Sequence, residues 1–171
     1  VYIKNESVFN ESFATFVEEM GVQGWLRDRG DTRALAAYQS RRAWRARVVK
    51  QIFNHRASLV RLYRSGLSAD VMRKKKELLF AHFRERYRNE RFEGQHPKIW
   101  DHWVLGKSNN ARLNAITAYH QYIPAFQQLF EENGSNLNVF FEKVRALTEV
   151  TPTDRVRQLS RLRSLPLKGL D

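Results

Sequence analysis

Apolar residues recur at intervals of three and four along almost the whole chain, and this spacing most constrains the fold. No run of alternating β-branched residues and no Asn-Gly hairpin signal interrupts it. The pattern predicts an all-α fold. A length of 171 residues with 42% hydrophobic and 12% aromatic content is typical of one folded helical domain, and residues 1–171 are predicted to form it.

Residues 31–91 are predicted to form a long antiparallel helical hairpin. Asp31 can cap a helix that reaches about residue 64. Gly66 then provides a C-terminal stop, and Ser68 can cap the return helix over 69–91.

The segments on either side of the hairpin are assigned from the same signals. A first helix is expected over residues 7–26, within segment 1–30. Gly94, Pro97 and Gly106 predict an irregular, Trp-containing loop over 92–108. Segment 109–171 then holds the C-terminal helices, which are expected at about 109–133 with a break near Pro124, at 136–148 and at 153–163.

Positive charge is concentrated in the middle of the chain. Residues 27–91 contain nineteen Lys or Arg and six acidic residues, whereas residues 1–26 contain one Lys and four Glu. Three interpretations stay open for this basic hairpin: a solvated surface, an anionic membrane surface as partner, or phosphate contacts with nucleic acid. Stacking on bases would use the interleaved aromatic residues Trp44, Phe53, Tyr63 and Phe80. The solvated surface is favoured, and no specific nucleic acid is expected as a partner.

The first helix separates acidic and aromatic residues. On a wheel of about 100° per residue, Glu18 lies close to Glu11, and Phe9, Phe13 and Phe16 lie opposite. Such a face alone is typical of a solvated surface helix. Glu11 and Glu18 are also about 10 Å apart along the axis, so at most one of them can bind a given metal ion.

The run from Phe9 to Glu18, FNESFATFVE, resembles the Asn-Glu-Gly-Phe-Ala helix of zinc aminopeptidases related to aminopeptidase N, with Ser12 in place of the usual Gly. A closer resemblance is to a bacterial family of predicted aminopeptidases, in which HELAHQ is followed by a segment similar to residues 1–4 and then by Asn-Glu-Ser-Phe-Ala-Thr. Further similar blocks are Asn109-Asn110-Ala111, Tyr119, Pro124-Ala125-Phe126 and Val144-Arg145-Ala146-Leu147. The resemblance therefore covers essentially the whole chain.

The resemblance implies the helical C-terminal portion of a gluzincin-like zinc metallopeptidase that hydrolyses peptides. Glu11 would be the third zinc ligand, with Glu18 and Asn10 supporting the ligands through hydrogen bonds. Tyr119 would stabilise the oxyanion. Asn109 and Asn110 would contact substrate, although capping of their own helix explains them equally well. Zinc would lower the pKa of a bound water and polarise the peptide carbonyl.

One departure limits this interpretation. No HExxH motif occurs in residues 1–171, and none of the five histidines pairs with another at i, i+4 around a Glu: His55, His82, His96, His102 and His120. The two histidine ligands and the general base would come from an upstream part of the same protein, so this chain alone is expected to be inactive. The chain also has no cysteine, which excludes thiolate metal sites and cysteine nucleophiles.

By the same resemblance, the full protein is expected in the periplasm or at a membrane of a Gram-negative bacterium. A different class of function also stays open. The chain would then be a non-catalytic basic module that binds nucleic acid or anionic membrane surfaces. Strong salt-dependent binding of DNA, without affinity for zinc in the longer chain, would favour this alternative.

Overall fold

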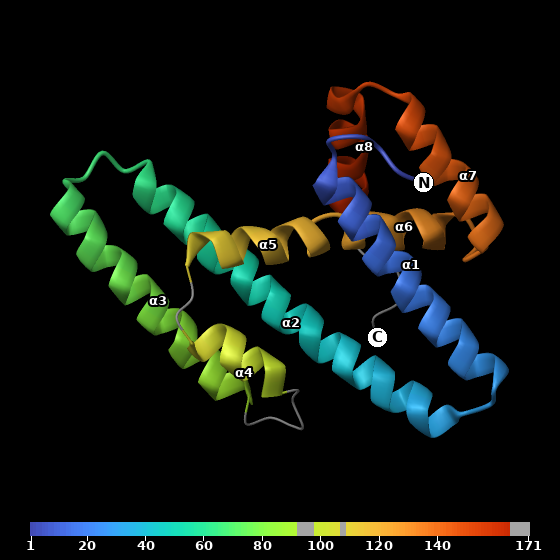
Figure 1. Cartoon of the computed structure of the whole chain (residues 1–171), viewed down its shortest axis with the longest axis horizontal. Helices are drawn as coiled ribbons and strands as arrows, with labels where there is room; N and C mark the ends of the chain where they lie inside the picture. Colours follow the sequence, from blue (N-terminus) through green and yellow to red (C-terminus); the bar gives the residue numbers. More distant parts are fainter. Residues whose placement is uncertain (92–97, 107–108, 165–171) are drawn as a thin grey trace. The chain divides into compact units, whose positions relative to one another are not determined.

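The computed structural model describes residues 1–91, 98–106 and 109–164. These residues form helices and connecting turns, with no β-strand among them, which confirms the predicted all-α class. No helix in the described part is both long and apolar enough to cross a membrane. The helices, drawn in Figure 1, are α1 (Ser7–Asp28), α2 (Thr32–Tyr63), α3 (Ala69–Arg91), α4 (Lys98–Leu105), α5 (Asn110–His120), α6 (Ile123–Glu132), α7 (Leu137–Glu149) and α8 (Pro152–Ser164).

The chain divides into two compact units, each with its own hydrophobic core. The first unit comprises Val1–Trp25 and Thr117–Asp171, and the second comprises Leu26–Ile116. The division falls within α1 and within α5.

An aromatic cluster forms the core of the first unit. Phe9, Phe13 and Phe16 of α1 are 1%, 8% and 0% exposed, as their place on the helical wheel predicts. Their rings pack against α6 and α7: the Phe9 and Phe126 centroids are 5.4 Å apart, and those of Phe16 and Phe140 are 5.0 Å apart. Leu159 of α8 completes the cluster.

The second unit is built on the antiparallel pair α2 and α3, which lie side by side in Figure 1. Asp31 caps α2 by accepting a 2.9 Å hydrogen bond from the Ala34 amide. Gly66 has a φ of +68°, a conformation that non-glycine residues rarely adopt, and it turns the chain toward α3. The predicted hairpin is therefore confirmed. Its core contains Trp44, Val48, Ile52, Leu59, Phe80, Phe83 and Tyr87, with Val104 of α4 and Leu113 of α5.

The prediction of an irregular loop over 92–108 is wrong for part of that segment, because α4 occupies Lys98–Leu105. Gly94 and Pro97 suggested a loop, but Trp100, Trp103 and Val104 follow helical spacing and pack against the second core. Residues 92–97 and 107–108 lie outside the described residues. The break near Pro124 is confirmed, since α5 ends at His120 and Pro124 lies in the first turn of α6.

Candidate functional site

Glu11 lies in the second turn of α1, in the part of that helix that belongs to the first unit. Its side chain is partly exposed, whereas the phenylalanines of the same helix are buried in the core. Its main-chain carbonyl accepts a 2.9 Å hydrogen bond from the Thr15 hydroxyl. Glu18, two turns further along, is exposed. The carboxylate of Glu11 is therefore available for a ligand outside the aromatic core.

The chain before α1 folds back along that helix. Asn5 has a φ of +68° within the turn that precedes α1. The Ile3 amide donates to Asn10 Oδ1 at 2.9 Å, and Asn10 Nδ2 donates to the Ile3 carbonyl at 2.7 Å. Asn10 therefore uses both ends of its amide to hold residues 1–4 beside α1. The geometry assigns it this positioning role, while its support of a metal ligand stays a prediction.

Ser12 connects α1 to the junction between α5 and α6. Its side chain is fully buried, its hydroxyl donates to the Ala118 carbonyl at 3.0 Å, and its oxygen accepts from the Tyr122 amide at 3.2 Å. Both backbone groups lie where α5 stops and α6 starts. The sequence marks Ser12 only as a substitute for glycine, because its partners are more than a hundred residues away.

Tyr119 follows directly after Ala118, in the last turn of α5, and its side chain is 45% exposed. Glu11 directly precedes Ser12. The predicted site residues Glu11 and Tyr119 are therefore the sequence neighbours of Ser12 and Ala118, which are joined by a hydrogen bond. Glu11, Asn10, Glu18 and Tyr119 all belong to the first unit.

The predicted substrate contacts Asn109 and Asn110 belong instead to the second unit. Asn109 Oδ1 accepts from the Arg112 amide at 3.0 Å, which makes Asn109 a cap of α5, one of the two roles that the sequence left open. Asn110 Nδ2 donates to the Tyr63 hydroxyl at 3.1 Å. Their contact with a substrate stays a prediction.

The zinc site predicted from the family resemblance needs three protein ligands. Across the described ranges, no three His, Asp or Glu side chains are grouped so that they could hold a metal ion. Glu11 can supply one carboxylate, but these residues do not form a zinc site by themselves.

Arg155 is a second buried polar connection that the sequence analysis missed. Its side chain is 3% exposed, and its guanidinium pairs with Glu6 at the start of the chain. It also donates to the carbonyls of Leu147 at 2.7 Å and Val150 at 2.8 Å, at the end of α7. Arg155 therefore satisfies carbonyl groups that a helix end leaves open and neutralises Glu6. Its partners are distant in sequence, so no local motif indicates this role.

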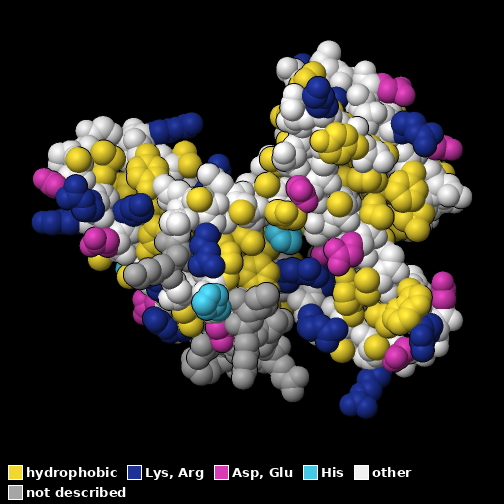
Figure 2. Space-filling view, in the orientation of Figure 1, with side chains coloured by type: hydrophobic (Ala, Val, Ile, Leu, Met, Phe, Trp, Pro, Cys, Tyr) yellow, Lys and Arg dark blue, Asp and Glu magenta, His cyan; other side chains and the backbone are white. Residues whose placement is uncertain are grey.

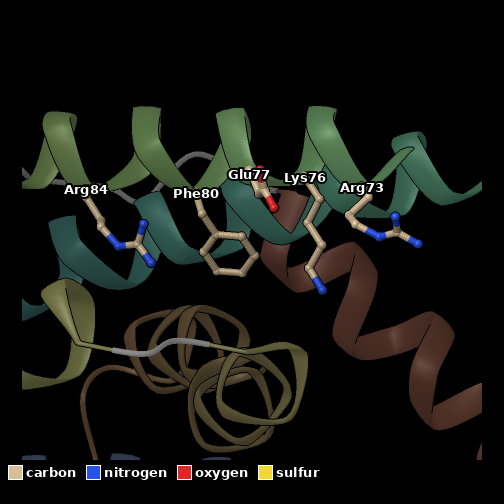
Figure 3. Close-up of a pocket in the computed structure, with 5 residues that line it drawn as sticks. All are labelled: Arg73, Lys76, Glu77, Phe80 and Arg84. Atoms are coloured by element: carbon tan, nitrogen blue, oxygen red, sulfur yellow. The ribbon is translucent and has the colours of Figure 1, made fainter. Parts of the chain in front are cut away.

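The basic hairpin buries two of its four aromatic residues that could stack on bases, whereas Phe53 is partly buried and Tyr63 is 45% exposed. Trp44 and Phe80 are 7% and 6% exposed and belong to the second core. Beside Phe80, one face of α3 lines a hollow of about 290 Å³. Figure 3 shows the four other lining side chains, three cationic and one acidic: Arg73, Lys76, Glu77 and Arg84. Base stacking by Trp44 or Phe80 is thus excluded by their burial.

His55 is the histidine most affected by its surroundings. It is 3% exposed, and its ring is stacked on Phe83 at 4.6 Å and meets Phe80 edge-on at 4.5 Å. Burial, together with the smaller effects of the Arg86 and Arg84 charges, lowers the pKa of His55 from 6.5 to about 4. His55 is therefore neutral near pH 7 and is part of the hairpin core.

Comparison with known proteins adds one finding. A family model described as Putative aminopeptidase matches residues 1–159. No curated protein and no solved structure gives a significant match. The matched range includes the Asn-Glu-Ser-Phe-Ala-Thr segment of α1, the α5–α6 junction and Arg155.

Proposed function

Because this chain belongs to the Putative aminopeptidase family, we propose that it forms the C-terminal helical part of a zinc-dependent peptidase in which Glu11 supplies one metal ligand. The observation that carries the proposal is the placement of Glu11. It lies in the segment whose resemblance to zinc aminopeptidases is most specific, on a rigidly packed helix, with its carboxylate outside the core. A ligand must be held in this way, because a metal site tolerates little displacement of its donors.

The turn before α1 supports the same proposal. Asn10 holds Ile3 beside the helix position that precedes Glu11. Val1 is two residues from Ile3 and hence at most about 7 Å away. A HELAHQ segment that precedes residues 1–4, as in the family that the sequence resembles, would therefore arrive close to Glu11. Its two histidines would complete the two-His, one-Glu set of a catalytic zinc.

The remaining residues of the first unit fit supporting roles in this proposal. The exposed Tyr119 can offer its phenolic hydroxyl to the oxygen of a substrate carbonyl. Glu18 can hydrogen-bond a ligand histidine. The general base would be the glutamate of the HExxH segment. The substrates are peptides, cleaved from their N-terminus as the family description implies, in the periplasm or at a membrane.

The test compares the 171-residue chain with a longer natural polypeptide that includes the upstream coding region. Both are stripped of metal, dialysed against zinc and assayed for bound zinc and for hydrolysis of amino-acid p-nitroanilides. The longer protein should bind one zinc ion and hydrolyse the substrates, and the 171-residue chain should do neither. Chelation should abolish the activity and zinc should restore it.

Glu11→Gln in the longer protein should remove tight zinc binding and lower kcat/KM by more than the ten- to hundredfold typical of a residue that only supports a ligand. The matched control is Glu142→Gln, at an exposed position of α7. Normal zinc content and activity in the Glu11 variant would refute the assignment. Zinc-dependent activity in the 171-residue chain would refute the proposal that the two histidine ligands come from an upstream segment.

A further inference from the structure

The helix α3 carries a second apolar face that the hairpin core does not use. With Phe80 as reference and about 100° per residue, Val71 and Leu78 lie roughly 160–180° away, on the side opposite the core. Leu78 is 59% exposed, Val71 is 39% exposed, and Leu67 in the preceding turn is 36% exposed. An exposed leucine on a surface helix is ordinary, but Val71 and Leu78 lie two turns apart on one side of the first half of α3, with Leu67 in the turn before it. We call these three aliphatic residues the patch.

Lysines flank this patch on both sides. On the same wheel Lys74 and Lys75 lie about 40–60° to either side of Leu78, and both are exposed. Over residues 61–76 the chain carries six basic residues and one acidic residue: Arg61, Arg64, Arg73, Lys74, Lys75, Lys76 and Asp70. Figure 2 shows hydrophobic side chains beside Lys and Arg over the end of the hairpin where α2 passes into α3.

We propose that this end of the hairpin, the face formed by Leu67, Val71, Lys74, Lys75 and Leu78, binds the surface of an anionic lipid bilayer. The aliphatic side chains would enter the boundary between headgroups and acyl chains, and the lysines would lie among the lipid phosphates. Beyond Leu78 the same face carries His82 and Glu85, so the contact is confined to the first half of α3.

Charge and side-chain type favour a bilayer over other occupants. A second copy of the chain would bring two strongly basic faces together, which like charges oppose. Nucleic acid would match the charge but not Leu67, Val71 and Leu78, because aliphatic side chains do not provide the aromatic surface on which single-stranded bases stack. Of the aromatic residues of the hairpin, Trp44 and Phe80 are buried, and the 45% exposed Tyr63 is a single ring whose hydroxyl accepts a hydrogen bond from Asn110.

The experiment uses the 171-residue chain and vesicles of phosphatidylcholine, with or without 30 mol% phosphatidylglycerol, in co-sedimentation at about 0.1 M salt. The chain should bind the anionic vesicles, and raising the salt to about 0.5 M should weaken that binding. Two variants test the face. Lys74→Gln with Lys75→Gln should reduce the partition coefficient about thirtyfold, and Val71→Ser with Leu78→Ser should reduce it about tenfold.

Each variant has a matched control in the first unit. Leu137→Ser with Val156→Ser changes the same residue types at 41% and 50% exposure. Lys143→Gln with Arg145→Gln removes the same charge from exposed positions of α7. The controls should bind as the parent does, and circular dichroism should show equal helicity in all proteins.

Several results would overturn the proposal. Equal losses in variants and controls would mean that net charge, not this face, drives binding. Equal binding to neutral vesicles would remove the role of the lysines. Tighter binding to duplex DNA than to anionic vesicles, or self-association that Val71→Ser with Leu78→Ser abolishes, would replace the bilayer with another occupant.

Discussion

The two units treat buried polar side chains differently. In the first unit, Ser12 and Arg155 are buried and hydrogen-bonded to groups far away in sequence. In the second unit, Gln51 and His55 are buried on the inner face of α2, and within the described residues neither the Gln51 amide nor His55 Nε2 has a hydrogen-bond partner. The first unit also has buried side-chain atoms without a partner among the described residues, Gln128 Oε1 and Glu131 Oε2. The contrast is that Ser12 and Arg155 connect distant helices of the first unit, whereas the buried Gln51 amide makes no such connection in the described part of the second.

This difference accords with the functions we propose for the two units. A metal ligand must keep its position, and buried polar connections that are fully satisfied fix one arrangement of the helices around it. A hairpin that presents an outer face to a partner needs only to stay folded, and an apolar stripe along α2 and α3 achieves that. The buried polar groups of the hairpin then lower its stability without a corresponding gain in specificity. Substitutions at these residues can test the contrast.

The largest effect is expected at Arg155. Arg155→Met should lower the free energy of unfolding by about 3–5 kcal/mol, because it leaves Glu6 and the carbonyls at the end of α7 without their partner. Urea denaturation followed by circular dichroism measures it. The control is Arg157→Met, whose side chain is 75% exposed and pairs with Asp154 of the same helix. That change should stay within about 0.5 kcal/mol of the parent. Similar losses at the two positions would show that the buried pair adds nothing special.

Ser12→Ala comes next, with an expected loss of about 2–3 kcal/mol. The substitution leaves the Tyr122 amide and the Ala118 carbonyl unsatisfied in a buried contact, and each such group costs about 1–3 kcal/mol. The same denaturation experiment checks it, with Ser58→Ala as control. The Ser58 hydroxyl donates to the Asn54 carbonyl and accepts from Arg61, both in its own exposed part of α2. If Ser12→Ala leaves the free energy of unfolding unchanged, the packing of the phenylalanines alone holds α1 against the α5–α6 junction.

His55 makes the stability of the second unit depend on pH. Its pKa is about 4 in the folded chain and 6.5 when exposed, so the unfolded state takes up a proton first as the pH falls. The stabilisation is complete above pH 6.5 and is lost as the pH falls toward 4. Between pH 7 and pH 5 the loss should be about 2 kcal/mol.

The measurement is the difference in unfolding free energy between pH 7 and pH 5, in the parent and in His55→Leu. The substitution should remove the His55 contribution, while His82→Leu at an exposed position of α3 should leave the difference unchanged. An equal pH dependence in the parent and in the His55 variant would show that the imidazole is hydrated in the folded state.

Features that depend on interactions between neighbouring residues could be predicted from the sequence, whereas features that depend on residues far apart in the chain could not. Asp31 and Gly66 act within one turn of their helices, and the structure has helix ends at both. The aromatic side of α1 could be predicted because burial follows helical spacing. Ser12 and Arg155 could not, since their partners lie 106 and 149 residues away and nothing local marks them. Likewise α4 was missed because tertiary packing of Trp100 and Trp103 outweighs the breakers around it.

The proposed metal site also combines a feature that local spacing predicts with one that it does not. Helical spacing predicted that Glu11 would be outside the core, and the structure confirms that. Its proposed role as a metal ligand rests on the family resemblance, because the described residues supply only one of the three donors that the proposed site needs. Helical spacing also could not predict that the Asn10 side chain would hold Ile3 against α1. This contact keeps residues 1–4 beside the part of the helix that contains Glu11.

The smallest expected effect is an increase in stability, at Gln51. Gln51→Met replaces a buried amide, which has no hydrogen-bond partner among the described residues, with an apolar side chain of similar length. The unfolded chain hydrates that amide but the hairpin core does not, so the substitution should raise the free energy of unfolding by about 1 kcal/mol. Gln39→Met, at an exposed position of the same helix, controls for the general effect of methionine on α2. A loss at Gln51 that Gln39 does not share would mean that the amide is bound to water in solution. Gln51 would then be satisfied in the hairpin as Ser12 and Arg155 are in the first unit, and the contrast between these buried residues would disappear.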